Sequence, residues 1–270
     1  MPVNLAERFR APTGRRVRLA DCDSADTCGW TKDRAVKRLA ENTAHLAELQ
    51  NRLYAENRRA LLVVLQGMDA SGKDGTIRHV FGPLNPQGCR VTSFKTPTPP
   101  ELAHDFLWRI HAAVPAHGEI AVFNRSHYED VLIVRVRNLV PRRVWSRRHA
   151  HINAFERLLT DAGTTVIKFF LHISPEEQRA RLRARLADPA KNWKFNPGDL
   201  AERELWPQYI AAYEDALSRC STRWAPWYII PADKKWFRNL AVSEIVRHHL
   251  EQLNPQYPPP PPDLDRYQIP

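Results

Sequence analysis

The apolar positions of this 270-residue chain fall into short continuous runs, with amphipathic stretches between them. Residues 61–65 are five apolar residues in a row, residues 119–123 and 227–230 are mostly or wholly apolar, and residues 164–173 are rich in β-branched and aromatic residues. Strands that are buried on both faces of a parallel sheet show such runs, because neither face meets water. Residues 90–94 are predicted to form one more, shorter strand. The pattern therefore predicts a parallel sheet.

The stretches between these strands have helical periodicity. Residues 31–59 are predicted to form one long helix, because Leu39, Leu46 and Leu53 recur at every seventh position. This stripe predicts that the helix docks on the rest of the domain; a contact between two copies of the chain is the alternative. Alternating strands and helices predict an α/β fold. The other predicted helices cover residues 101–113, 152–159, 199–219 and 237–253, and the segment after Ser174.

The loop after the first strand matches the pattern G-x-x-x-x-G-K, from Gly67 to Lys73. Glycines let backbone amides curl around phosphate oxygens, and the lysine adds a positive charge. The helix that should begin near Asp74 directs its positive N-terminal end at the same anion. A structural glycine turn is the alternative, but the strand in front favours a phosphate-binding loop, or P-loop. Its predicted phosphate contacts are Ala70, Ser71, Gly72, Lys73 and Asp74.

This loop departs from the usual pattern in its acidic residues. The residue after the lysine is ordinarily Ser or Thr, whose hydroxyl ligates the magnesium of a nucleotide. Here it is Asp74, and Asp69 lies inside the loop. Two carboxylates repel a chain of phosphates unless a cation stands between them. A divalent metal held by acids is therefore implied.

Two further strands deliver polar residues to the edge of the sheet where open α/β folds bind ligands. Residues 95–100 follow the second strand, where Lys95 is a candidate phosphate contact and the prolines a candidate wall of a nucleoside pocket. Asn124 takes the place of the usual metal-binding acid after strand 119–123, and Arg125 follows it as a fixed cation for a transferring phosphoryl group. Glu129 is expected to ligate metal, hold Arg125 or lie near the acceptor. His127 is expected to form hydrogen bonds rather than act as a base.

Residues 174–219 are the predicted lid. Ser174 to Glu177 form a capping box, and the following helix carries four arginines. Arg179 and Arg183 share one helix face, whereas Arg181 and Arg185 share another. A break at residues 188–197 contains Lys191 and Lys194. This arrangement resembles the arginine-bearing lids of nucleoside monophosphate kinases, which close over phosphates and exclude water.

We expect one domain over residues 1–270. Its predicted parts are an N-terminal arm and helix (1–59), a P-loop core (60–173 and 220–253), the lid (about 174–219) and a proline-rich tail (254–270). The first 30 residues are interpreted as a solvated, loosely packed arm, with contact to a polyanion as the alternative. Five consecutive prolines at 258–262 predict an extended polyproline tail.

Composition narrows the class of protein. The chain is 43% hydrophobic, so it can bury a core, and it carries 40 basic against 30 acidic residues, a net charge of +10. This excess favours a polyanionic partner: nucleic acid, an anionic membrane or inorganic polyphosphate. The four cysteines form no C-x-x-C pair, which argues against zinc and fits a reducing cytosol. No apolar run has membrane-spanning length, so we expect a cytoplasmic protein without membrane contact.

Several motifs together resemble the family-2 polyphosphate kinases over about residues 30–250. They are GMDASGKDGT, SFKTPTPPELAHDFLWR, FNRSHYEDVL, KFFLHIS with PEEQ, KNWKF and STRWAPWYIIPADKKWFRN. The resemblance implies a thymidylate-kinase-like P-loop fold, a three-layer sandwich with a parallel sheet and a helical lid. It also implies Mg²⁺-dependent phosphoryl transfer between inorganic polyphosphate and nucleotides, with Mn²⁺ as the alternative ion.

The resemblance assigns roles to residues of this chain. The implied catalytic residues are Asp69, Lys73, Arg125 and Glu129, with Asp69 and Glu129 as metal ligands. The implied polyphosphate contacts outside the P-loop are Arg179, Arg183, Lys191 and Lys194. The implied nucleotide contacts are Lys95, Thr96, Pro97, Asn124, Arg125 and Asp130.

The NRSHYED form resembles the subgroup that accepts both AMP and ADP, giving ADP and ATP. Guanine nucleotides are further candidate substrates, and a dimer or tetramer is expected, with the N-terminal helix as its contact. Because other members carry Asp where this chain has Asn124, the identity of the metal ligands stays open between Glu129 and Asp130.

Two other functions are alternatives for this sequence. An ATP-dependent nucleotide or polynucleotide kinase shares the fold but should have Ser or Thr in place of Asp74. A basic P-loop module that binds nucleic acid would need aromatic stacking platforms, for which Trp193 and Phe195 are candidates. Lys73, Asp69 and Arg125 together argue against a module that only binds.

Overall fold

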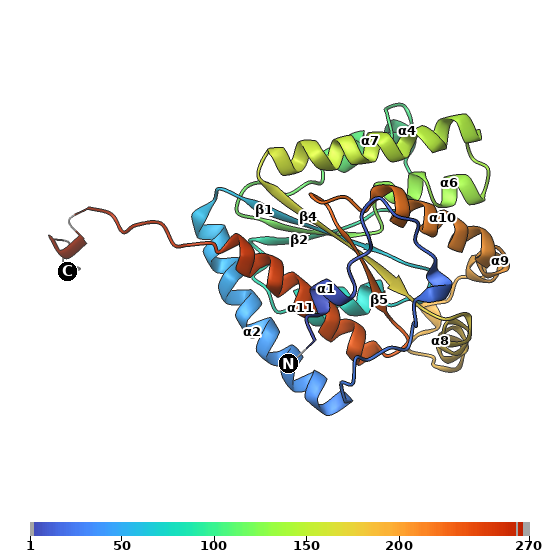
Figure 1. Cartoon of the computed structure of the whole chain (residues 1–270), viewed down its shortest axis with the longest axis horizontal. Coiled ribbons are helices and arrows are strands. Elements are labelled where there is room, and N and C mark those ends of the chain that lie inside the picture. The colour runs from blue at the N-terminus through green and yellow to red at the C-terminus, as the bar shows by residue number, and fades with distance from the viewer. Residues whose placement is uncertain (1–2, 263, 267–270) are drawn as a thin grey trace.

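A five-stranded parallel sheet forms the centre of the computed structural model, which describes residues 3–262 and 264–266 (Figure 1). The strand order is β2-β3-β1-β4-β5. Every residue of the central strand β1 is buried, which explains why its sequence is a continuous apolar run. The strands are β1 (Ala60–Gln66), β2 (Cys89–Ser93), β3 (Ile120–Asn124), β4 (Thr164–His172) and β5 (Trp227–Pro231).

Helices cover both faces of the sheet, so the molecule is the predicted α/β sandwich of three layers. One face carries α2 (Lys32–Glu56) and α11 (Lys235–Leu253), and the other carries α7 (Arg142–Asp161) and α10 (Trp206–Cys220) (Figure 1). Successive side chains of a strand point to opposite faces. In β1, Leu61, Val63 and Leu65 therefore join the core under α2 and α11, whereas Leu62 and Val64 join the core under α7 and α10.

Short elements complete the chain, most of them at the ends of strands. The α-helical ones are α1 (Leu5–Arg8), α3 (Lys73–Thr76), α4 (Pro99–Leu102), α5 (Trp108–His111), α6 (Ile133–Val136), α8 (Pro175–Ala187) and α9 (Gly198–Glu204). The others are η1 (Leu19–Asp21), η2 (Ile77–Phe81), η3 (His127–Asp130), η4 (Asn192–Lys194) and η5 (Leu264–Arg266).

The long N-terminal helix is confirmed as α2, and its apolar stripe docks on the domain. Leu46 and Leu53 are fully buried in the core that α2 shares with α11, and Leu39 is half-buried against it. The helix ends where Asn57 adopts a left-handed conformation at φ 50°, which asparagine tolerates. A contact between copies of the chain through this helix stays a prediction.

Three helix predictions need correction. Residues 101–113 do not form one helix: α4 and α5 are separated by a turn in which Asp105 Oδ1 accepts a hydrogen bond from the Leu107 amide at 2.9 Å. Residues 199–219 form two helices, α9 and α10, because Pro207 lacks an amide hydrogen and sits in the first turn of a new helix. The helix predicted at 152–159 begins earlier, at Arg142, so the basic run of residues 142–148 is helical.

The N-terminal arm is packed on the domain, in contrast to the loosely packed arm expected from its sequence. The Ala11 amide donates to Trp227 O at 2.8 Å, and the Ile229 amide donates to Phe9 O at 2.9 Å. Leu5, Phe9 and Leu19 are buried. An edge strand exposes unpaired backbone groups, and here the arm supplies the partners that β5 needs.

The predicted lid divides into two parts. Helices α8 and α9 stand at the carboxyl ends of the strands, whereas α10 lies against the sheet with Tyr213 and Leu217 buried in the core (Figure 1). The proline-rich segment after α11 has no regular secondary structure up to residue 261 and extends away from the sandwich (Figure 1). Residues 1–2 of the predicted arm and 263 and 267–270 of the predicted tail lie outside the described residues. Within the described part of the chain, no helix is long and apolar enough to span a membrane.

Candidate active site

The P-loop has the strand–loop–helix setting that its sequence predicts. The loop begins after β1 at Gly67 and ends where α3 starts at Lys73. Gly67 has φ +155° and Gly72 has φ +105°, conformations that side chains rarely adopt. A Cβ atom on Gly72 would lie 1.7 Å from Arg238 Nη1. Both glycines are therefore required by the backbone path of the loop.

Lys73 reaches back across the loop. Its Nζ donates hydrogen bonds to Gly67 O at 2.8 Å and to Met68 O at 3.4 Å, and the side chain borders the cleft above the loop. Burial, with a smaller contribution from Arg125, lowers the pKa of Lys73. Lys73 thus brings one positive charge to the rim of the amide cradle, as a P-loop lysine does.

The two acids of the loop each pair with a residue from the end of β3. Asp69 Oδ1 accepts from Arg125 Nη2 at 2.8 Å, and Asp74 Oδ1 accepts from Asn124 Nδ2 at 2.8 Å. Arg125 has φ +62°, in the left-handed region that is costly for a residue with a side chain. Strain of this kind gathers at functional sites. The pairs bind the P-loop to the turn after β3.

Glu129 completes this cluster from the same turn. Its Oε1 accepts from Gln66 Nε2 at 3.2 Å, and its Oε2 lies 3.9 Å from Arg125 Nη1. Glu129, Asp69 and Arg125 also line a small cavity of about 180 Å³ that is closed by Tyr209 and Asp199. The predicted catalytic set Asp69, Lys73, Arg125 and Glu129 is therefore brought together around the loop.

A fully buried ion pair lies beneath the turn that carries Arg125 and Glu129. Lys168 Nζ of β4 donates to Glu156 Oε2 of α7 at 2.5 Å, and both side chains are 0% exposed. The Tyr128 hydroxyl donates to Glu156 Oε1 at 2.9 Å, and His127 Nε2 lies 3.2 Å from the same oxygen. His127 is buried away from the cleft, in line with its predicted hydrogen-bonding role.

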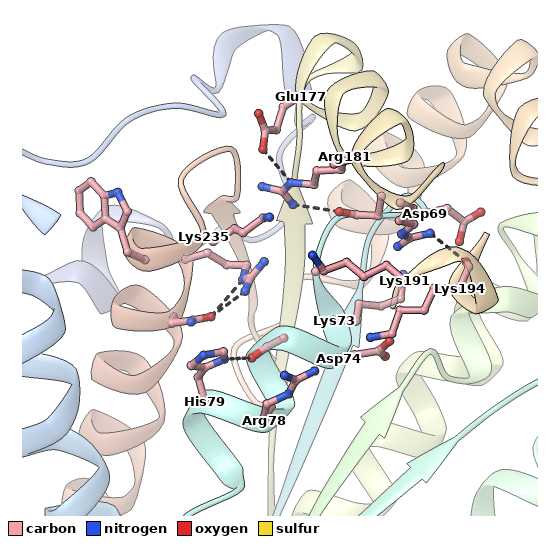
Figure 2. A pocket seen from close by; sticks show the side chains of 18 of the residues that line it. Asp69, Lys73, Asp74, Arg78, His79, Glu177, Arg181, Lys191, Lys194 and Lys235 are labelled. Carbon is pink, nitrogen blue, oxygen red and sulfur yellow. Dashed lines mark hydrogen bonds and ion pairs between the residues drawn. The ribbon is translucent and has the colours of Figure 1, made fainter. Parts of the chain in front are cut away.

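A cleft of about 990 Å³ opens above the P-loop, and cations surround it (Figure 2). Besides Lys73 in the loop and Arg125 after β3, these cations come from three parts of the chain: the segment after the loop, the lid, and the start of α11. Asp69, Asp74 and Glu177 are its acidic members. The basic residues besides Lys73 and Arg125 are Arg78, Arg181, Arg185, Lys191, Lys194, Lys235 and Arg238.

The four lid arginines differ in where they lie relative to the cleft. Arg179 and Arg183, the predicted polyphosphate contacts, are exposed and do not line the cleft, whereas Arg181 and Arg185 do. Both pairs have the same helical spacing, and the packing of α8 decides which pair faces the P-loop. Lys191 and Lys194 line the cleft as predicted.

Two cleft residues on α11 lie outside the predicted set of site residues. Lys235 and Arg238 are three positions apart and so lie on one face of the first turn of α11. Their position directly after the carboxyl end of β5 was the signal available in the sequence. Arg238 is 2% exposed, and burial, with a smaller effect of Arg181, lowers its pKa to about 9. No carboxylate among the described residues forms an ion pair with Arg238.

The predicted nucleotide contacts fall into two groups. Asn124 and Arg125 border the cleft, but the loop of Lys95, Thr96 and Pro97 does not line it, and Lys95 O instead accepts from Arg109. Asp130 pairs with Arg148 Nη1 at 2.8 Å. Burial raises the pKa of Asp130 to about 6, although Arg148 opposes this shift.

The carboxylates of the cleft suit a metal that is shared with a substrate. No group of three or more acidic, His or Cys side chains in residues 3–262 and 264–266 is arranged as a metal cage. Mg²⁺ is ordinarily held by one or two carboxylates together with substrate phosphates. Asp69 and Asp74 present hard oxygen ligands next to the phosphate cradle, which fits that mode of binding.

The parallel sheet, the P-loop with its lysine, the arginine after β3 and the cationic lid define the class of P-loop phosphotransferases. Comparison with known proteins gives the family. The model of the polyphosphate kinase 2 family matches residues 29–258, and the chain belongs to this family. The sequence resemblance is thereby confirmed, and the chain is an enzyme, a phosphotransferase.

Similar proteins support this assignment over nearly the whole chain. An "AMP/ADP-polyphosphate phosphotransferase" of Meiothermus ruber is 54% identical over 94% of this chain and 96% of its own. An "ADP-polyphosphate phosphotransferase" of Rhodopseudomonas palustris is 44% identical over 93% of this chain and 92% of its own. The crystal structure of polyphosphate kinase 2 from Arthrobacter aurescens is 45% identical with a TM-score of 0.94, covering 97% of this chain and 94% of its own.

Proposed function

We propose that this enzyme transfers phosphoryl groups from inorganic polyphosphate to AMP and to ADP, with Mg²⁺ as the metal. The observation that carries the proposal is the length and charge of the cleft. Its cations extend from Arg125 past the P-loop to Lys235 and Arg238 on α11. A nucleoside triphosphate would fill only the part at the P-loop, whereas a polyphosphate chain can contact the whole row. The names of the two similar phosphotransferases support the same donor and acceptors.

The chemistry that this site supports is positioning and charge neutralisation. Phosphoryl transfer has a loose transition state with charge spread over the equatorial oxygens, so fixed cations lower its energy. Lys73 and Arg125 flank the loop and are held in place by Gly67 O and Asp69. The acceptor is itself a phosphate that needs little base catalysis, and the histidine that lines the cleft, His79, has its Nδ1 2.7 Å from Gly75 O. We therefore propose direct transfer with no phosphorylated enzyme intermediate.

The metal has a defined place in this proposal. Asp69 and Asp74 would hold Mg²⁺ together with phosphate oxygens, and Glu129 lies 3.9 Å from Arg125 and lines the same small cavity as Asp69. A bound divalent ion neutralises phosphate charge and so permits two carboxylates beside a polyanion. Asp69 must then exchange part of its contact with Arg125 for the metal. Guanine nucleotides as substrates and an oligomer through α2 stay predictions from the family resemblance.

The experiment that tests the proposal supplies polyphosphate as the only phosphoryl donor. Wild-type enzyme, Mg²⁺ and AMP should yield ADP and then ATP, as measured by anion-exchange chromatography. Asp69→Asn and Lys73→Ala should lower kcat by at least about a hundredfold, because each removes charge stabilisation at the reacting phosphate. Conversion of added ADP alone would leave the donor assignment standing but contradict the acceptance of AMP. No product until ATP is added would contradict the donor assignment.

A further inference from the structure

The P-loop is held from outside by side chains of α8, the first helix of the lid. Gln178 Nε2 donates to Asp69 O at 2.9 Å, and Arg181 Nη1 donates to Ala70 O at 2.9 Å and to Ser71 O at 3.0 Å. Three successive carbonyl groups of the loop are thus bonded to one helix face. Gln178 is 1% exposed and Arg181 is 8% exposed, so these bonds are shielded from water.

Arg181 has no hydrogen-bond donor left for a substrate. A guanidinium carries five N–H donors. Its Nε donates to Glu177 Oε1 at 2.8 Å, its two Nη1 hydrogens serve the P-loop carbonyls, and its Nη2 donates to Ala232 O at 2.6 Å and Asp233 O at 3.0 Å. Four of the five acceptors are backbone carbonyls. Although Arg181 borders the phosphate cleft, its bonds connect the P-loop to the loop after β5.

Holding these carbonyls also sets the direction of the amides that must bind phosphate. In a planar trans peptide, the C=O of one residue and the N–H of the next point in opposite directions. The contact at Asp69 O therefore turns the Ala70 amide away from α8, and the contact at Ser71 O does the same for the Gly72 amide. Ala70 and Gly72 both line the cleft.

The backbone of the loop needs such support. Ala70 has φ +61°, a left-handed conformation that is unfavourable for a residue with a Cβ atom. Conformations of this kind persist only where the surroundings over-determine them. Its carbonyl bond to Arg181, with the bonds on both neighbouring carbonyls, provides that constraint. Arg238 adds another bond to Ser71 O at 3.2 Å.

We propose that Gln178 and Arg181 are positioning residues that hold the P-loop amides in the orientation that binds the donor phosphates. The proposal rests on the proposed function in one respect, namely that the P-loop ligand is a chain of phosphates. It also implies that α8 stays fixed to the P-loop, and α9 is bonded to α8 in turn, because Arg203 Nη1 donates to Gln178 Oε1 at 2.7 Å and to Pro175 O at 2.8 Å. Arg185, on the same helix face, also lines the cleft and pairs with Asp199 Oδ2 at 3.3 Å.

The decisive variant is Gln178→Met, because it removes no charge: it removes the bond to Asp69 O, together with the bond that Gln178 Oε1 accepts from Arg203 Nη1 at 2.7 Å. Binding of inorganic tripolyphosphate is measured by isothermal titration calorimetry in the absence of nucleotide. We expect the dissociation constant to rise about tenfold or more, since a buried carbonyl loses its donor and the loop loses its set orientation. Gln208→Met is the matched control: Gln208 is an exposed glutamine on α10 and should change binding less than twofold.

Arg181→Met tests the second contact and should weaken tripolyphosphate binding more than Gln178→Met does. Arg142→Met removes the same charge from an exposed position on α7, where Arg142 has no hydrogen bond or ion pair within the described residues. We expect that control to weaken binding at most about threefold, an effect of net charge alone. If Arg181→Met does not fold, the decision rests on the neutral Gln178→Met variant.

Steady-state kinetics separate positioning from a loss of stability. Positioning predicts that Gln178→Met raises KM for polyphosphate while KM for the nucleotide stays within about twofold. A variant that is only less stable would lose Vmax through its folded fraction and keep both KM values. Unchanged tripolyphosphate binding in Gln178→Met would overturn the inference. Loss of binding in an enzyme that cannot use polyphosphate as donor would overturn the proposed function and leave the inference standing.

Discussion

Removing one partner of the buried Lys168–Glu156 ion pair should destabilise the enzyme strongly. Both side chains are 0% exposed, and their charged atoms are 2.5 Å apart. Lys168→Met leaves a carboxylate in the core, and Glu156→Gln leaves an ammonium group there. Breaking a buried pair in this way costs about 3–5 kcal/mol of the free energy of unfolding. Typical domains have about 5–15 kcal/mol in total, so the variants should still fold in the cold.

The structure refines this magnitude for each variant. After Lys168→Met, Glu156 keeps hydrogen bonds from Tyr128 at 2.9 Å and from His127 at 3.2 Å, and it can also take up a proton. After Glu156→Gln, Lys168 keeps the Tyr128 hydroxyl at 2.9 Å and Cys220 O at 2.8 Å. These remaining partners place both single variants toward the lower end of the range, about 3 kcal/mol.

The double variant isolates the interaction between the two charges. If the charges pair, Lys168→Met with Glu156→Gln should be destabilised by at least about 2 kcal/mol less than the sum of the two single variants. Guanidinium chloride unfolding, followed by circular dichroism, supplies the three free energies. Changes that add within about 0.5 kcal/mol would refute the reasoning, because they would show that the two groups are not paired as charges in the core.

Three further predictions concern the loop, the cleft and acid stability. Gly72→Ala should abolish activity, because the added Cβ atom would lie 1.7 Å from Arg238 Nη1. Gly14→Ala is the control: Gly14 also has a positive φ (+67°), but its Cβ atom would meet no atom within 4 Å. This control should lose only about 1–2 kcal/mol of stability, as measured by thermal unfolding. Tripolyphosphate should raise the Tm of Arg238→Met less than it raises the Tm of the wild-type enzyme, because the variant lacks the buried unpaired cation that the polyanion compensates. An equal rise in Tm in both proteins would contradict the role of Arg238 in the cleft. Burial lowers the pKa of His127, so its contribution to stability should be lost as pH falls below about 6.5, where the unfolded chain takes up a proton. Burial would raise the pKa of Glu156, but Lys168 and His127 outweigh it and lower that pKa, so a second loss should follow below about pH 4.3. Denaturant midpoints measured from about pH 7.5 down to about pH 2.5 check both steps, and a flat profile would contradict them.

The sheet and the P-loop could be predicted from local sequence patterns. A strand buried on both faces and a glycine loop depend on residues that are neighbours in the chain, so β1 and Gly67 to Lys73 could be located before the structure was known. The ends of β2 and β3 also followed, because parallel strands bring their carboxyl ends to the same edge.

Contacts between distant segments could not be predicted from the sequence. The orientation of α8 decides that Arg181 and not Arg179 meets the P-loop, and this orientation comes from packing against residues more than 100 positions away. The pairing of the N-terminal arm with β5 joins Phe9 to Ile229 for the same reason. In the break after α4, the Asp105 side chain accepts a hydrogen bond from the Leu107 amide, and local side-chain bonds of this kind compete with helix formation.

The proposed function depends on polyphosphate being the direct phosphoryl donor. The measurement that tests it most directly uses polyphosphate labelled with ³²P, unlabelled AMP, Mg²⁺ and enzyme in single-turnover amounts. If polyphosphate is the direct donor, label should enter the β-phosphate of ADP first and the γ-phosphate of ATP later. The protein should retain no label after denaturation. Label on the denatured protein, or label in nucleotides only after unlabelled ATP is supplied, would contradict it.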